Sequence, residues 1–189
     1  MKSERNIRNK LATNITIGTH VDTDKWFAKI LRGKRFNTGI DIGCNNGYGF
    51  SIYGRPFVEK ATFVDFADKC LVEARKLHGD GHQYICADIT KEWPICGKYN
   101  LVCLVQIIQH IPDEKLAERI FAKACSLCVD TMLFSHYRAK KREVGTFSNG
   151  LFYRRLPYSD IDRIITENNM NYIAIEKTGG DYNFVLGKK

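Results

Sequence analysis

Gly39–Gly47 reads GIDIGCNNG, and this stretch decides the fold because it joins an apolar run to a turn that contains glycine. Eighteen residues after Gly47, a second apolar run, ATFVD, ends at Asp65. A strand that turns sharply at its carboxyl end needs glycine where its backbone approaches a ligand closely. A neighbouring parallel strand brings a carboxylate to the same edge, where it can accept hydrogen bonds from ribose hydroxyls. The spacing predicts the nucleotide-binding half of a parallel sheet.

Hydrophobic periodicity and turn residues predict alternating strands and helices along the rest of the chain. The predicted strands are Thr38–Ile42, Ala61–Val64, His82–Ala87, Tyr99–Val105, Thr131–Ser135, Tyr172–Lys177 and Asn183–Leu186. The predicted helices are Lys25–Leu31, Tyr48–Tyr53, Ala67–Leu77, Asp113–Cys125 and Tyr158–Asn168, and Ala139–Gly150 is predicted to be a loop. This order indicates an α/β fold: a Rossmann-like three-layer α/β/α sandwich with a mostly parallel seven-stranded sheet and a C-terminal antiparallel β-hairpin. We expect one domain over 1–189, with 1–36 as an N-terminal helix and lid segment and 37–189 as the core.

The composition is that of an ordinary globular protein, with 44% hydrophobic and 26% charged residues among 189. No apolar run approaches the roughly 20 residues that span a bilayer, and MKSERNIRNK lacks the apolar core of a signal peptide. The seven cysteines are scattered, and the single CxxC pair, Cys125 and Cys128, has no partners at zinc-finger spacing. We therefore expect a cytoplasmic protein with no membrane partner and no metal site.

The net charge of +8 favours anionic partners, and part of it is clustered in the C-terminal half. The clustered residues are Arg138, Lys140, Lys141, Arg142, Arg154 and Arg155. A solvated loop that keeps the protein soluble would have the same composition, and no RNA-binding motif accompanies the cluster.

Four segments, in order, resemble the class I S-adenosylmethionine-dependent methyltransferases over about Gly39 to Lys189. They are the turn Asp41–Gly47, Val64–Asp65 with the following FADKCLVEARK, Ala87–Asp88, and the strand and loop YNLVCLVQIIQHIPD of Tyr99–Asp113. In that family the turn surrounds the methionine moiety, the second acid holds the ribose and the third lies beside the adenine amino group. The terminal hairpin is also what this family adds to the Rossmann sheet.

The resemblance implies S-adenosylmethionine as cofactor and S-adenosylhomocysteine as product. The cofactor-binding residues that it implies are Asp41, Gly43, Cys44, Asn45, Gly47, Asp65, Phe66, Asp88, Ile89 and Val105. The chain departs from the family pattern at Asn45, Asn100 and Gln106, where Gly, Asp and an acidic residue are common. A nicotinamide-binding protein is the nearest rival, but its GxGxxG fingerprint fits poorly to the GxxxGxG of Gly43, Gly47 and Gly49.

Methyl transfer needs an acceptor lone pair in line with the donor methyl, so positioning supplies most of the rate. A base is needed only where the acceptor must lose a proton. His110 is the first candidate because the loop after the fourth strand opens at the carboxyl edge, His136 is the second and His20 the third. A histidine at position 110 that only hydrogen-bonds to backbone would look the same in the sequence.

The sequence lacks the marks of nucleic-acid methylation: QIIQ stands where an NPPY-like turn would be, Pro94-Ile95-Cys96 is not a Pro-Cys nucleophile, and no Lys-Asp-Lys-Glu tetrad is visible. These absences favour a small-molecule or peptide acceptor attacked through oxygen or nitrogen. Tyr137, Arg138, Tyr153 and Arg154, in the segment His136–Tyr158, suggest a substrate-binding wall for an acceptor with a ring and an anionic group. An equally good alternative is that the aromatic side chains belong to the core and the arginines are ordinary surface residues.

The favoured function is therefore a methyltransferase (EC 2.1.1.-) acting on an O or N atom of a small molecule. One alternative is an RNA or protein methyltransferase that uses the basic loop Lys140–Arg142. Another is a cofactor-binding regulatory or structural subunit without catalysis, which the departures at Asn45, Asn100 and Gln106 permit.

Overall fold

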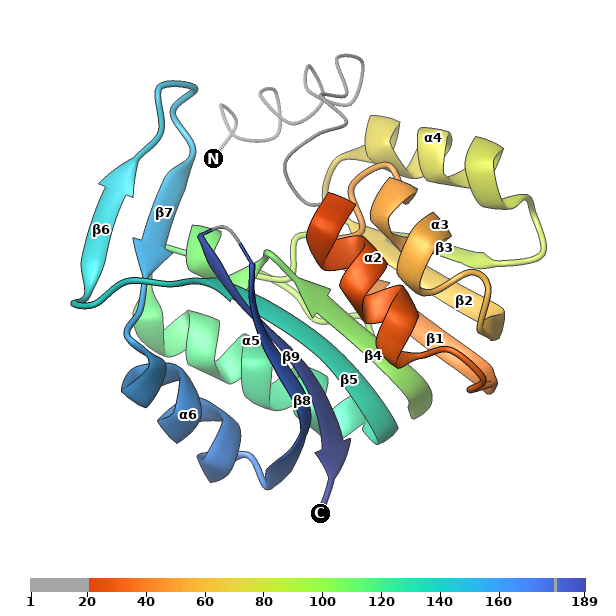
Figure 1. The fold of residues 1–189 in the computed structure, drawn as a ribbon. Helices are drawn as coiled ribbons and strands as arrows, with labels where there is room; N and C mark the ends of the chain where they lie inside the picture. Colours follow the sequence, from red (N-terminus) through yellow and green to blue (C-terminus); the bar gives the residue numbers. More distant parts are fainter. Residues whose placement is uncertain (1–20, 179) are drawn as a thin grey trace. The chain divides into compact units, whose positions relative to one another are not determined.

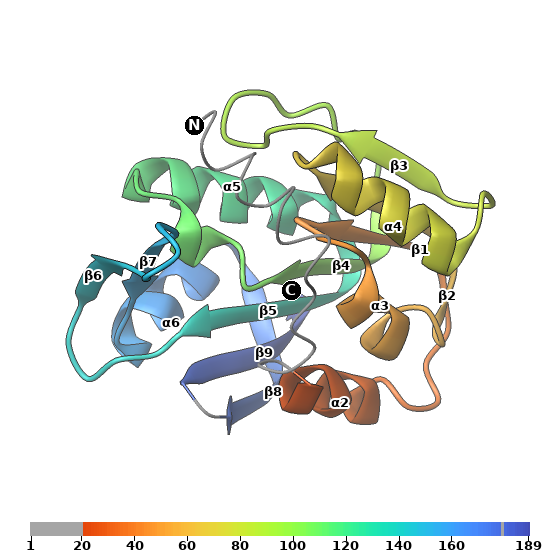
Figure 2. The same cartoon turned by 90° about the horizontal axis from the view of Figure 1, so that it is seen from above.

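The computed structural model describes residues 21–178 and 180–189 (Figures 1 and 2). The chain divides into two compact units between Ile95 and Cys96. The predicted lid segment lies largely among residues 1–20, and His20 with it, outside the described residues. Among the residues that are described, no helix is both long and apolar enough to cross a membrane.

The first unit contains three parallel strands and three helices. The strands are β1 (Phe36–Ile42), β2 (Val58–Asp65) and β3 (Gln83–Cys86), and the helices are α2 (Val21–Ile30), α3 (Tyr48–Tyr53) and α4 (Asp68–His78). β2 lies between β1 and β3, with Ile42 opposite Val64 and Asp65 opposite Cys86. The carboxyl ends of all three strands therefore meet at one edge, where the sequence predicted the ligand-binding turn.

Aromatic side chains join the helices of this unit to its sheet. Phe63 on β2 meets Phe50 of α3 edge-on at 5.0 Å and stacks on His78 of α4 at 4.6 Å between ring centroids. Both phenylalanines are fully buried. α4 lies along β2 and β3 (Figure 2), so this aromatic core fixes α3 and α4 beside the strand ends.

The second unit contains β4 (Tyr99–Val105), β5 (Cys128–Tyr137), β8 (Met170–Thr178) and β9 (Asp181–Lys188), with the 3-10 helix η1 (Ile108–His110), α5 (Glu114–Leu127) and α6 (Tyr158–Glu167). β4 and β5 are parallel, and β9 lies antiparallel between β5 and β8. The predicted terminal hairpin is therefore confirmed. Phe121, Phe134 and Phe184 form the centre of this unit, with Phe134 against the other two at 4.7 and 5.7 Å.

The prediction of a loop over Ala139–Gly150 is wrong in part, because Glu143–Thr146 forms strand β6 and pairs antiparallel with β7 (Phe152–Arg155). The two strands stand out from the rest of the unit in Figure 1. Their turn is closed by the Phe147 N–H, which donates to the Leu151 carbonyl at 2.9 Å. The glycines at 145 and 150 resemble strand breakers, but Ser-Asn-Gly at 148–150 is a hairpin turn signal.

Helix α2 begins at Val21, four residues before the predicted start at Lys25. By residue type, Asp22, Thr23 or Asp24 could cap a helix that begins at Lys25, but all three lie within the helix, and the last two are buried. The acidic first turn suits the positive end of the helix dipole. Burial of Asp24 also places a carboxylate inside the first unit, where it becomes part of the candidate site.

Candidate active site

The turn after β1 is built from left-handed backbone. Gly43, Asn45 and Gly47 have φ of 75°, 52° and 76°. The Gly43 and Cys44 N–H groups both donate to the Val64 carbonyl, at 2.7 and 3.0 Å, which holds the turn against β2. Asparagine tolerates this region better than other residues with a side chain. The departure from glycine at position 45 therefore preserves the turn.

Asp65 connects this turn to the start of α4. Its Oδ2 accepts from the Asn45 N–H and its Oδ1 from the Ala67 N–H, both at 2.9 Å. The residue is only 3% exposed. A carboxylate has about four acceptor sites, which is the chemistry that holding ribose hydroxyls requires. Asp65 thus fits the predicted role and also holds the backbone of the turn, which the sequence did not reveal.

Three buried carboxylates, Asp24, Asp41 and Asp65, gather in the first unit. Burial raises the pKa of Asp41 to about 8, the 3.3 Å hydrogen bond from the Tyr53 hydroxyl opposes that rise, and the charges of Asp24 and Asp65 add to it. Like charges buried together favour either a shared proton or a cationic ligand. The sequence analysis did not include Asp24 in the candidate site, because nothing in the pattern showed that α2 would bury it.

We expect Asp41→Asn to stabilise the protein at pH 8 and to flatten its pH dependence. Folded Asp41 keeps a proton that the unfolded chain releases near pH 4, so its contribution to stability is full below pH 4 and falls as the pH rises towards 8. The gain at pH 8 should be on the order of a few kcal/mol. Urea unfolding at pH 5 to 8.5 measures it, with the exposed Asp22→Asn as control. Parallel pH curves for wild type and Asp41→Asn would contradict the buried-proton assignment.

Asp88 follows β3 and is held as an ionised acceptor. Its Oδ1 accepts from the Thr90 N–H at 3.1 Å and from the Thr90 hydroxyl, and its Oδ2 lies 3.1 Å from Lys91 Nζ. Burial alone would raise its pKa, but the hydrogen bonds from Thr90 and Lys91 and the lysine charge lower it. Asp88 and Ile89 are half-buried, so an amino group could approach the carboxylate.

Gly47 has a packing role beside its role in the turn. A Cβ at this position would lie 2.8 Å from His78 Nε2, and the Gly47 carbonyl is 2.9 Å from the same nitrogen.

Burial raises the pKa of the Cys44 thiol well above its ordinary value, so Cys44 is a neutral lining group rather than a nucleophile. Within the described part of the chain, no cluster of His, Cys, Asp and Glu could hold a metal ion.

In the second unit, His110 is oriented by the β6–β7 hairpin. Its Nδ1 lies 2.7 Å from the Phe152 carbonyl, which can only accept, so Nδ1 carries the proton. In the neutral ring Nε2 then has the lone pair, and it lies 3.4 Å from the Tyr137 hydroxyl. This is the tautomer that a general base at Nε2 requires.

Aromatic rings surround His110. Tyr137 meets its ring edge-on at 5.4 Å and Phe147 lies at 6.4 Å, while Tyr153 lies 4.6 Å from Phe147. The sequence predicted Tyr137 and Tyr153 as substrate-binding residues but missed Phe147, since the hairpin that carries it was interpreted as a loop. Hairpin residues thus bring a flat apolar surface to the candidate base.

His136 is the weaker candidate base. It is buried, and its Nδ1 lies 2.8 Å from the Tyr137 carbonyl. Burial lowers the pKa of His136 to about 4, although the bond to that carbonyl opposes the change. A base with so low a pKa accepts a proton poorly near neutral pH.

The two arginines predicted to bind substrate have different surroundings. Arg154 is 5% exposed, and its Nη2 donates to the Pro112 carbonyl at 2.8 Å, which ties β7 to the segment before α5. Arg138 is exposed, and its backbone N–H donates to the Gly180 carbonyl at 2.8 Å. Of the two, Arg138 alone has a side chain on the surface.

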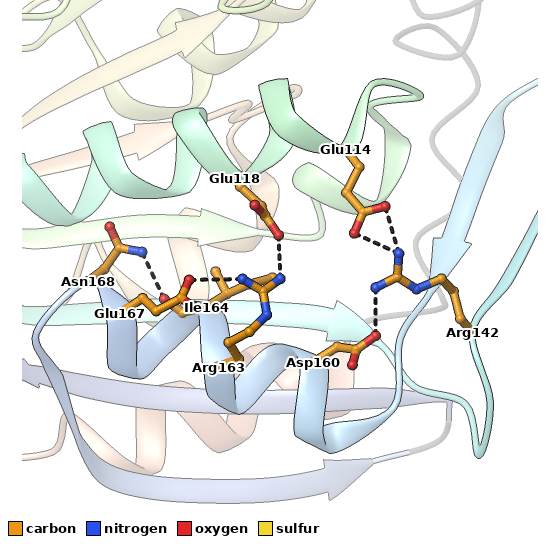
Figure 3. Close-up of polar contacts among 8 residues, drawn as sticks. All are labelled: Glu114, Glu118, Arg142, Asp160, Arg163, Ile164, Glu167 and Asn168. Carbon is orange, nitrogen blue, oxygen red and sulfur yellow. Dashed lines mark hydrogen bonds and ion pairs between the residues drawn. The ribbon is translucent and has the colours of Figure 1, made fainter.

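Arg142, part of the predicted basic loop, forms ion pairs within the unit (Figure 3). Its Nη1 lies 2.7 Å from each Glu114 carboxylate oxygen, and its Nη2 lies 2.8 Å from Asp160. Arg163 makes a similar bridge between Glu118 and Glu167 (Figure 3). Arg142 therefore anchors the segment before β6 to α5 and α6, and its charge is matched by two carboxylates.

Comparison with known proteins identifies the fold through solved structures. No family model and no curated protein matches the chain. Solved structures do match. The structure of DhpI in complex with SAH has 13% sequence identity and a TM-score of 0.75, and the match covers 98% of this chain and 95% of the DhpI chain. The Burkholderia thailandensis 1,6-didemethyltoxoflavin-N1-methyltransferase has 12% identity, TM-score 0.73 and coverages of 96% and 86%. N-methyltransferase NodS from Bradyrhizobium japonicum has 11% identity, TM-score 0.70 and coverages of 88% and 86%. The chain therefore has the fold of the class I S-adenosylmethionine-dependent methyltransferases, as its sequence motifs predicted.

Proposed function

We propose that this protein is an S-adenosylmethionine-dependent methyltransferase (EC 2.1.1.-) that methylates an O or N atom of a small molecule. The observation that carries the proposal is the set of buried carboxylates, Asp24, Asp41 and Asp65, beside a left-handed turn in a methyltransferase fold. S-adenosylmethionine carries a sulfonium and an ammonium group, and buried carboxylates are stabilised by such cations. These three carboxylates therefore fit the positive charges of the cofactor.

The residues at the strand ends of the first unit would hold the cofactor. Asp65 would accept from the ribose hydroxyls, and Asp88 would accept from the adenine amino group through Oδ2, because its Oδ1 already accepts two hydrogen bonds from Thr90. Asp41, Gly43, Cys44, Asn45, Gly47, Phe66 and Ile89 complete the proposed set in this unit, and the family resemblance adds Val105, which ends β4 in the second unit. When bound, the cofactor supplies a methyl group activated by the sulfonium charge.

His110 would take the proton that the acceptor O–H or N–H loses during transfer. The Phe152 carbonyl fixes its tautomer, and the Tyr137 hydroxyl marks the direction from which a donor group approaches Nε2. The rings of Tyr137, Phe147 and Tyr153 would hold the flat part of the acceptor. A small-molecule acceptor agrees with the name of one structural neighbour, the 1,6-didemethyltoxoflavin-N1-methyltransferase.

One further observation disfavours a polyanion-binding loop, and another agrees with the expected compartment. The ion pairs of Arg142 with Glu114 and Asp160 remove it from the basic loop that a polyanion would need. All seven cysteines lie among the described residues and all are free thiols, as is usual in the reducing cytoplasm where we place the protein.

Calorimetry with S-adenosylmethionine and S-adenosylhomocysteine tests the proposed function. We expect micromolar binding by the wild type, and Asp88→Ala should weaken it about 3- to 10-fold, the effect of one hydrogen bond to a charged group in a half-exposed site. Asp80→Ala removes an acid that is 87% exposed and serves as control. Absence of binding of both ligands to folded protein would contradict the proposal.

A further inference from the structure

Two glutamines at the end of β4 form a polar pair inside the second unit. Gln109 on η1 is fully buried, and its Nε2 donates to the Oε1 of Gln106. Gln106 has a left-handed φ of 60°, and its backbone N–H donates to the Ser135 hydroxyl at 3.0 Å. Left-handed backbone is costly for a glutamine, and such strain concentrates at functional sites.

The pair leaves one donor and one acceptor unused. Among the described residues, neither Gln106 Nε2 nor Gln109 Oε1 has a hydrogen-bond partner, although both atoms are buried. Exchanging the O and N atoms of both amides reverses the bond between them and again leaves one donor and one acceptor. The result therefore does not depend on amide assignment. Buried amide groups without partners are unfavourable, so this pair is suited to a ligand that carries both an acceptor and a donor.

The ligand group must also be neutral. Two amides carry no net charge, and burying an ion against them would leave its charge uncompensated. The amino-acid end of the methyl donor is a zwitterion, which suits the carboxylates of the first unit better. Gln109 directly precedes His110, the proposed base, and Ser135 lies two residues before Tyr137. The pair thus belongs to the end of β4 and β5 where the acceptor would lie.

We propose that Gln106 and Gln109 recognise a neutral amide or lactam edge on the methyl acceptor. This inference rests on the proposed function, because it assigns the pair to the acceptor of that reaction. At this position it replaces the anionic group expected from the sequence with a neutral one, on a planar compound whose adjacent C=O and N–H groups are complementary to the two side chains. Gln106 Nε2 would donate to its carbonyl, and Gln109 Oε1 would accept from its N–H.

The test uses benzamide, benzoate and N,N-dimethylbenzamide as probes, with the side-chain NH2 signals of the glutamines as the NMR readout. Benzamide should shift the signals of Gln106 and Gln109. Benzoate, which is charged, and the dimethyl compound, which lacks the N–H donor, should bind at least about tenfold more weakly. Gln109→Leu should lose the discrimination, and Gln109→Met is a second variant in case the first folds poorly. Gln83→Leu alters a glutamine in the first unit and should behave as the wild type.

Two results would overturn the inference. If S-adenosylmethionine alone shifts both glutamine signals while benzamide does not, the pair binds the donor. If no probe shifts them, the pair is a structural element satisfied by water. Calorimetry on the same sample reports donor binding separately, so a failure of the proposed function is distinguishable from a failure of the glutamine pair.

Discussion

Replacing His110 with alanine is expected to lower turnover by about 10²- to 10⁴-fold, the range for removing a general base. The effect should fall on kcat, with the affinity for the donor unchanged, because His110 is proposed to take a proton from the acceptor and is not one of the proposed cofactor-binding residues. The measurement is transfer of a labelled methyl group to amide and lactam heterocycles that carry an O–H or N–H. Addition of imidazole should restore part of the lost activity.

The tautomer gives a second test that needs no acceptor. Long-range 1H–15N correlation should show His110 protonated at Nδ1 when neutral, as its 2.7 Å contact with the Phe152 carbonyl requires. His82→Gln alters a half-buried histidine of the first unit and controls for the general loss of an imidazole. A proton on Nε2, or turnover by His110→Ala within a few-fold of wild type, would contradict the role of base.

The strand ends could be predicted from sequence because the determinants are local. Glycine in the turn, an apolar run that ends in an acid, and a second acid after β3 specify the positions of Gly43, Asp65 and Asp88 without knowledge of the packing. Parallel pairing then brings them to one edge. The terminal hairpin also has its signal in a short stretch, the turn around Gly180.

Features that depend on tertiary contacts could not be predicted. Burial of Asp24 follows from how α2 packs, and the pairing of Arg142 with Glu114 joins positions 28 residues apart. From the sequence alone, Asp24 and Arg142 both look like charged residues exposed to solvent. The left-handed φ of Gln106 leaves no mark in the sequence, since glutamine is unusual there. The sequence showed only that glutamine stands where an acid is common in the family, and it did not show the contact of Gln106 with Gln109.

Asp65→Ala is expected to weaken S-adenosylhomocysteine binding by about 1.5–3 kcal/mol, roughly 10- to 150-fold, the range for hydrogen bonds to a charged group. The same substitution should lower the melting temperature, because the N–H groups of Asn45 and Ala67 lose their acceptor. The loss of affinity therefore has two possible causes, direct contact with the ribose and loosening of the turn. Calorimetry on one variant does not separate them.

A double-mutant cycle does separate the two causes, with S-adenosylhomocysteine and its 2′,3′-dideoxy analogue as the ligands. If Asp65 accepts from the ribose hydroxyls, their removal costs the wild type about 1.5 kcal/mol or more and costs Asp65→Ala almost nothing. Asp88→Ala is the matched control, since removal of the hydroxyls should weaken its binding as much as it weakens binding by the wild type. Equal penalties in wild type and Asp65→Ala would mean that Asp65 acts only through the turn. The ribose would then need another partner at this edge, and the carboxylate that ends β2 would be a structural residue.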